Sequence, residues 1–133
     1  LERTPVDRIG RPGAVVADKD GRYRPLPDEE MVEPGKVPRF SDREARLAWM
    51  DEEAIEAVVL WPSLGLGMEW QLRDDPAACV ANLCAFNRWV DEAWGFAHQR
   101  RIFAVPTLTL VDLEAAVREL DFVLRRGARM IHV

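Results

Sequence analysis

Side chains that could contact a small molecule follow the ends of three apolar runs in this chain. Trp61 and Ser63 follow the first run, Thr109 follows the second, and His132 lies near the end of the third. Two hydroxyls, one imidazole and one indole could together hold a small polar substrate. Two of them also have a simpler explanation, because Ser63 suits a turn and His132 suits a hydrogen-bonded position in the core. We expect all four residues to contact a substrate.

Metal ligands are scarce in the sequence. A zinc site needs three or four histidine, cysteine or carboxylate ligands at one point. The chain has two histidines, His98 and His132, without His-x-His or His-x-x-x-His spacing. His98 is expected on the surface or at a helix end. The sequence therefore assigns neither a metal ligand nor a catalytic residue within this segment.

The elements that carry these side chains alternate between apolar runs and amphipathic helices. Short apolar runs bounded by turn residues are typical of strands, and a 3.6-residue apolar period is typical of helices. The strands are expected at 57–61, 102–106 and 129–133, and the helices at 41–53, 75–98 and 112–126. This order predicts an α/β fold with a parallel sheet, in which ligands bind beyond the carboxyl ends of the strands.

The expected helix boundaries have local signals of their own. Ser41 and Glu44 have the spacing of a capping box. The pair Asp75-Pro76 suits a helix start, because proline at the first helical position has no amide that needs a partner. Asp112 precedes the last apolar period, and Gly127 follows it as the residue that can adopt a left-handed conformation.

Residues 1–40 differ from the rest of the chain. Six of the nine prolines and four of the eight glycines lie in residues 1–38, where no apolar period is present. An irregular segment of this length inside a compact domain is usually either functional or disordered. Ile9, Tyr23 and Leu26 offer apolar anchors, so the preferred interpretation is an irregular excursion over an active site. A disordered segment is the alternative.

Composition restricts the expected partners. The formal net charge is −5 and lysine or arginine runs are missing, which argues against nucleic acid. No apolar stretch approaches the ~20 residues that span a bilayer. Cys79 and Cys84 cannot face each other on one helix, and reduced thiols predict a cytoplasmic protein. The expected partner is a small-molecule substrate, and the uncovered last strand predicts that the sequence is part of a larger protein.

Five segments followed by a glycine keep an informative order and spacing. They are Arg46–Ile55, Val58–Ser63, Ala85–Trp89, Arg101–Val105 and Glu114–Leu120, followed by Gly127. Together they resemble the amidohydrolase-related family, metal-dependent hydrolases similar to aminocarboxymuconate semialdehyde decarboxylase. The resemblance covers about residues 41–133 and rests on order and spacing, since none of the segments is diagnostic alone.

The resemblance implies part of a (β/α)8 TIM barrel. The chain would supply the excursion after strand one, and residues 41–133 would supply strands two to four with their helices. It also implies hydrolysis or non-oxidative decarboxylation of a small carboxylate-bearing or aromatic substrate, with a divalent metal, expected to be zinc, held by residues outside this segment. Arg24 would bind a substrate carboxylate, and a homodimer or higher homo-oligomer is expected.

Three positions depart from the family's pattern. Ala54 stands where glycine is common, Glu56 where aspartate is common, and Thr109 where proline is common. These departures leave the barrel as the expected fold and leave the substrate open. The alternative is a non-catalytic α/β interaction module. An upstream Asp-x-His-x-His and a downstream strand ending in histidine would select the enzyme.

Overall fold

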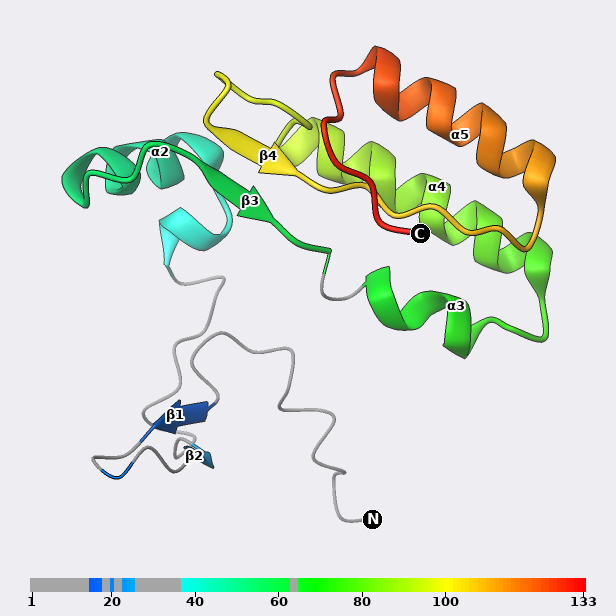
Figure 1. Ribbon diagram of the computed structural model, residues 1–133, viewed down its shortest axis with the longest axis horizontal. Helices are drawn as coiled ribbons and strands as arrows, with labels where there is room; N and C mark the ends of the chain where they lie inside the picture. The colour runs from blue at the N-terminus through cyan, green and yellow to red at the C-terminus, as the bar shows by residue number, and fades with distance from the viewer. Residues whose placement is uncertain (1–14, 18–19, 21–22, 26–36, 63–64) are drawn as a thin grey trace.

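Helices and short strands alternate through most of the chain (Figure 1). The computed structural model describes residues 15–17, 20, 23–25, 37–62 and 65–133. Its strands are β1 (Val15–Ala17), β2 (Tyr23–Pro25), β3 (Val58–Leu60) and β4 (Ile102–Ala104). Its α-helices are α2 (Arg43–Glu52), α3 (Met68–Gln71), α4 (Pro76–Ala93) and α5 (Leu113–Arg125), and its 3-10 turns are η3 (Pro38–Phe40) and η4 (Gly65–Gly67).

The strands β3 and β4 pair in parallel, which confirms the prediction for the first two strands. Val58 lies opposite Ile102 and Leu60 opposite Ala104. The long helix α4 lies between the two strands in sequence and makes the crossover that a parallel pair requires.

The third expected strand, 129–133, is reduced to a single parallel bridge between Thr107 and His132. The Leu108 amide donates to the His132 carbonyl at 2.9 Å, and the His132 amide donates to the Pro106 carbonyl at 3.0 Å. The predicted strand is parallel as expected but too long. One reason is that Pro106 has no amide to donate to a longer ladder.

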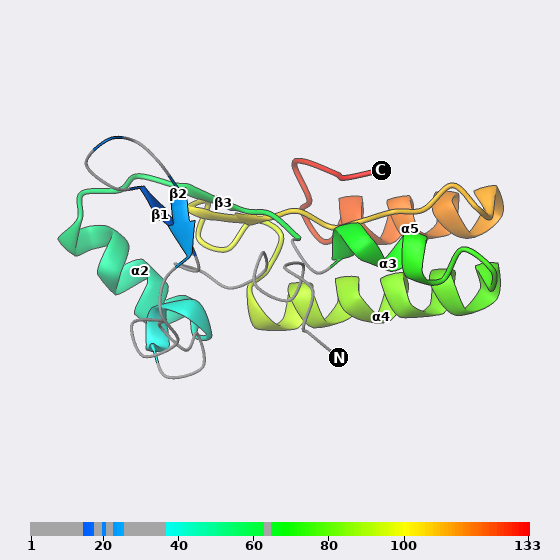
Figure 2. The same ribbon diagram turned by 90° about the horizontal axis from the view of Figure 1, so that it is seen from below.

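The helices α2 and α4 lie on the same side of the β3–β4 pair (Figure 2). Side chains alternate across a strand, so Ile102 and Ala104 are buried toward the core. Val59 is 50% exposed on β3. The two faces of the pair therefore have different environments, one packed against helices and one open.

One hydrophobic cluster joins three helices to β4. Its buried members come from α2, α4, β4 and α5 and from the residues that follow the last three of these elements: Leu47, Met50, Val90, Trp94, Phe96, Ile102, Ala104, Leu108, Val123 and Ala128. Leu108 belongs to this cluster, so the segment that follows β4 is anchored in the core before it reaches Thr109.

The start of α2 differs from the prediction. Asp42, not Ser41, caps the helix, and its Oδ1 accepts the Ala45 amide at 2.7 Å. Glu44 lies 2.9 Å from His98 Nε2 instead of capping its own helix. The predicted capping box is therefore wrong. Ser41 and Asp42 could each serve as the cap, and Glu44 contacts His98, which is distant in the sequence.

The helix α4 ends at Ala93, five residues before the predicted end at 98. Gly95 has a φ of +74°, and its amide donates to the Val90 and Asp91 carbonyls. A glycine in the left-handed region stops a helix, whereas Trp94 and Ala97 continued the apolar period of the sequence beyond the true end. The predicted starts at Asp75 and Asp112 are confirmed, since each side chain accepts an amide three residues later.

Two helices end with the same hydrogen-bond pattern. The Ile55 amide donates to the Met50 carbonyl after α2, and the Ala128 amide donates to the Val123 carbonyl after α5. The left-handed residue is Gly127 in the second case, with φ +96°, as predicted. In the first case it is Ala54, with φ +54°, where an L side chain costs about 1 kcal/mol. This conformation explains why glycine would suit position 54.

The segment 1–40, expected to be irregular, contains short regular elements within the described ranges. The strands β1 and β2 form a separate antiparallel pair in which Val16 lies opposite Arg24. The turn η3 follows and leads directly into α2.

Candidate functional site

The carboxyl ends of the parallel strands bring together two residues that were predicted to contact a substrate. The rings of Trp61 and His132 meet edge to face, with centroids 5.8 Å apart and an interplanar angle of 78°. Trp61 follows β3 and is 54% exposed. An indole that keeps half of its surface open beside an imidazole offers an apolar wall with a polar edge.

Thr109 lies beyond the end of β4 and has a partner that the sequence did not suggest. Its hydroxyl donates to Glu69 Oε1 at 2.5 Å, and its Oγ1 accepts the Val111 amide at 3.3 Å. Glu69 belongs to α3, a helix of four residues, so no periodic or motif signal links it to Thr109. We call Trp61, Glu69, Thr107, Thr109 and His132 the rim.

Two buried polar atoms of the rim have no hydrogen-bond partner in the part of the chain that the structure describes. They are Thr107 Oγ1 and His132 Nδ1. An unpaired buried polar atom costs roughly 1–3 kcal/mol, so such atoms gather where function opposes stability. Gly65 covers the Thr107 hydroxyl closely, since a Cβ there would lie 3.2 Å from Oγ1 and 3.1 Å from Phe86 Cε1. A side chain at position 65 would therefore require Phe86 or Thr107 to shift by a few tenths of an ångström.

Ser63 and Arg24 were also predicted to contact a substrate. Ser63 lies outside the described residues. Arg24 is described through its backbone, which pairs with Val16 in the β1–β2 sheet. Their contacts with a substrate stay predictions. His98, which was not assigned to the site, pairs with Glu44 near the start of β4, at the amino ends of the strands.

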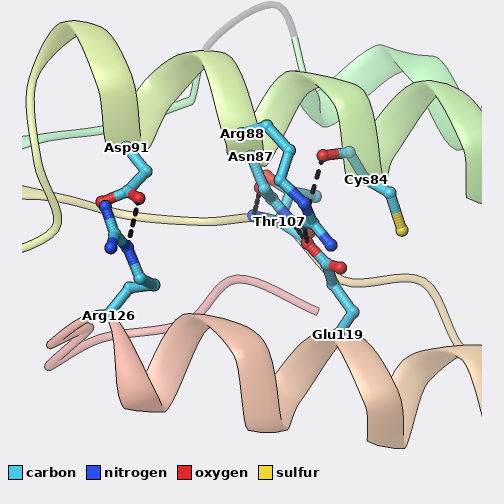
Figure 3. A network of polar contacts seen from close by, with 7 residues as sticks. All are labelled: Cys84, Asn87, Arg88, Asp91, Thr107, Glu119 and Arg126. Carbon is cyan, nitrogen blue, oxygen red and sulfur yellow. Dashed lines mark hydrogen bonds and ion pairs between the residues drawn. The ribbon is translucent and has the colours of Figure 1, made fainter.

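A buried polar network lies behind the rim, between α4 and α5 (Figure 3). Asn87 Oδ1 accepts the Thr107 amide at 2.9 Å, and Asn87 Nδ2 donates to the Thr107 carbonyl at 2.9 Å. The same Nδ2 donates to Glu119 Oε1 at 2.9 Å, and Arg88 Nη1 donates to that oxygen at 2.5 Å. Asn87 is fully buried and Glu119 is 5% exposed.

The network changes the acid–base properties of its neighbours. The hydrogen bond to Glu119 raises the pKa of Arg88, so this guanidinium stays charged. Burial first, and then Glu119, raises the pKa of the Cys84 thiol from 9.0 to about 11. A thiol with that pKa is protonated at neutral pH and is a poor nucleophile.

Two hollows lie near these elements, and neither is a substrate site at the rim. A cavity of ≈ 10 Å³ lies behind Thr107 and Thr109, against Cys84 and Glu119. Small-molecule sites are commonly 300–1,000 Å³, so this cavity is far too small. A groove of ≈ 870 Å³ lies between the starts of α4 and α5, away from Trp61 and His132.

The described residues do not fit a catalytic metal centre. Among them, no three histidine, cysteine, aspartate or glutamate side chains come close enough to hold an ion.

Among the described residues, no helix is both long and apolar enough to cross a membrane.

Comparison with solved structures shows what the chain is similar to. The chain is similar to the crystal structure of an amidohydrolase from Mycobacterium avium subsp. paratuberculosis K-10, with 39% sequence identity and a TM-score of 0.72. The match covers 80% of this chain and 29% of the solved chain, so this sequence corresponds to less than a third of that protein's length. No family model and no curated protein matches the chain.

Proposed function

The chain is related to an amidohydrolase over four fifths of its length, and we propose that it forms part of the active-site rim of a metal-dependent barrel enzyme. The reaction would be hydrolysis or non-oxidative decarboxylation of a small carboxylate-bearing or aromatic substrate. The observation that carries this proposal is the meeting of Trp61 and His132 at the carboxyl ends of parallel strands, where ligands bind in such folds.

The metal of this proposal would be held by residues that the chain does not contribute. Amidohydrolases are typically metal-dependent, and the described residues offer no ligand cluster. A divalent ion such as zinc supplies activation of water or polarisation of the substrate when it is bound. Trp61, Glu69 and His132, the rim residues that are not buried, would bind and orient the substrate beside it.

The charges at the rim favour one orientation of the substrate. Glu69 beside Thr109 places a carboxylate at one side, which repels a carboxylate-bearing substrate. The substrate carboxylate would therefore lie toward Arg24, whose planar fork suits two carboxylate oxygens. Its apolar part would pack on Trp61, with His132 at the edge.

The first test uses the complete metal-loaded enzyme, a panel of small aromatic and aliphatic carboxylates as substrates, and benzoate as a binding probe. Chelation should abolish turnover. Arg24→Lys keeps the charge but loses the fork, so kcat/KM should fall on the order of tenfold for each lost ~1.4 kcal/mol. Arg100→Lys, at an exposed position before β4, is the matched control and should behave as wild type.

Glu69→Gln should act in the opposite direction. Removing one negative charge from the rim should tighten benzoate binding severalfold in calorimetry, while Arg24→Lys weakens it. Unchanged benzoate binding in both variants would contradict a carboxylate site at this rim. A complete protein that turns over no member of the panel, with or without metal, would favour the interaction module instead.

A further inference from the structure

We infer that Asn87, on the outer helix α4, is a positioning residue that holds the carboxyl end of β4 in place for the rim. The inference rests on the proposed function of the rim. Asn87 contacts no rim atom that is open to a substrate, and its side chain is fully buried. It would act through Thr107 alone.

The contact has the hydrogen-bond pattern that a neighbouring strand would provide. The Asn87 amide accepts from the Thr107 N–H and donates to the Thr107 carbonyl, each at 2.9 Å. One side chain thus satisfies both backbone groups of one residue, as a neighbouring peptide would in a sheet. Thr107 is buried, so losing this partner would leave two buried backbone groups unpaired.

The segment needs this support because its own ladder is weak. The strand β4 ends at Ala104, and Pro106 cannot donate a hydrogen bond. The bridge to His132 consists of two hydrogen bonds, from Leu108 and to Pro106. The position of His132 relative to β4 therefore depends on the stretch that Asn87 fixes.

A carboxylate and a guanidinium fix the direction of the Asn87 amide (Figure 3). Glu119 Oε1 can only accept, so it selects Nδ2 as the atom that faces it at 2.9 Å. Arg88 compensates the buried charge of Glu119 and lies 3.6 Å over the Phe122 ring. A change in the distance between α4 and α5 would therefore move Glu119 relative to Asn87, and through Asn87 it would move Thr107.

The experiment measures hydrogen–deuterium exchange of residues 105–111 and the Kd for benzoate, both on the complete metal-loaded protein. Asn87→Leu removes all three hydrogen bonds. It should speed exchange of the Thr107 and Leu108 amides and raise the benzoate Kd, each by roughly tenfold, the factor that corresponds to ~1.4 kcal/mol. Asn82→Leu is the control on the same helix, because Asn82 donates to its own helix at Ala78.

Two further variants keep the test decisive if Asn87→Leu does not fold. Asn87→Asp keeps the acceptor for the Thr107 amide but faces Glu119 with a second carboxylate. Compared with the wild type at the same pH, its exchange at 105–111 should be faster at neutral pH and should approach the wild-type rate on acidification, because two close carboxylates share a proton. Glu119→Gln keeps an oxygen for Asn87 and should show a smaller effect than either Asn87 variant.

The outcomes separate this inference from the proposed function. Wild-type exchange at 105–111 in the Asn87 variants would overturn it, as would faster exchange with an unchanged benzoate Kd. If the wild-type protein binds no benzoate and shows no metal-dependent turnover, the proposed function fails. The exchange measurement then still decides whether Asn87 holds this segment.

Discussion

The two ends of the β3–β4 pair are held together by different chemistry. At the amino ends, Arg101 donates to the Asp51 carboxylate and to the carbonyls of Ile55 and Glu56, all near the surface. At the carboxyl ends, the buried Asn87 holds the Thr107 peptide. The first end is fastened by charged groups that water can reach, and the second by a neutral amide in the interior.

The two ends also differ in how their buried polar atoms are satisfied. Arg46 Nε, in α2, has no hydrogen-bond partner among the described residues, but its guanidinium lies over the rings of Phe40, Trp49 and Trp94. Aromatic faces stabilise a cation, so this group has compensation. Thr107 Oγ1 and His132 Nδ1 likewise have no hydrogen-bond partner among the described residues, and the His132 ring has one aromatic neighbour, Trp61. Two of the unpaired buried polar atoms therefore lie at the end where a substrate would bind, and sites of function are where such departures are expected.

The largest predicted effect concerns the amino ends. Arg101→Met should lower the free energy of unfolding by about 2 kcal/mol, because it removes a charged hydrogen-bond donor from three acceptors. Chemical denaturation of the complete protein measures the loss. The kcat/KM of the folded protein should be unchanged. Arg100→Met, at the exposed neighbouring position, is the control, and an equal loss there would remove the special role of Arg101.

The second prediction concerns the carboxyl ends and has the opposite pattern. His132→Phe keeps an aromatic ring beside Trp61 and removes a buried nitrogen that has no partner in the described structure. Stability should therefore stay the same or rise slightly, while kcat/KM of the complete enzyme should fall at least about tenfold. Full activity in this variant would show that His132 serves the core alone.

The third prediction concerns pH and the network behind the rim. Because burial and Glu119 raise the pKa of Cys84 to about 11, its alkylation by iodoacetamide should be slow at neutral pH and should rise as pH approaches 11. In Glu119→Gln the negative charge is gone, so the pKa should fall and alkylation should begin at lower pH. Cys79→Ser removes the second thiol from the assay. Rapid labelling of Cys84 at pH 7 would contradict the arrangement of this network.

The smallest predicted effect tests the end of α2. Ala54→Gly should stabilise the protein by about 0.5–1 kcal/mol, because glycine adopts the left-handed conformation without a Cβ conflict. Gly127→Ala makes the reverse change at the matching position after α5 and should destabilise by a similar amount. Thermal unfolding of both variants measures the difference, and equal signs for the two would contradict the shared pattern of helix ends.

The sequence by itself determined the elements whose signals are local. The caps at Asp75 and Asp112 and the stop at Gly127 depend on residues within one turn, and a parallel β3–β4 pair follows from apolar runs joined by a helix. Strand ends also pointed to Trp61 and His132, because carboxyl ends of parallel strands share one edge.

Only the tertiary structure decided which polar groups meet across long stretches of chain. Thr109 with Glu69, and Asn87 with both Thr107 and Glu119, join elements that no periodicity relates. The same holds for the start of α2, where Glu44 contacts His98 and Asp42 caps the helix. A polar side chain binds whichever partner packing brings within about 3 Å, and packing is set by the whole core rather than by neighbours in sequence.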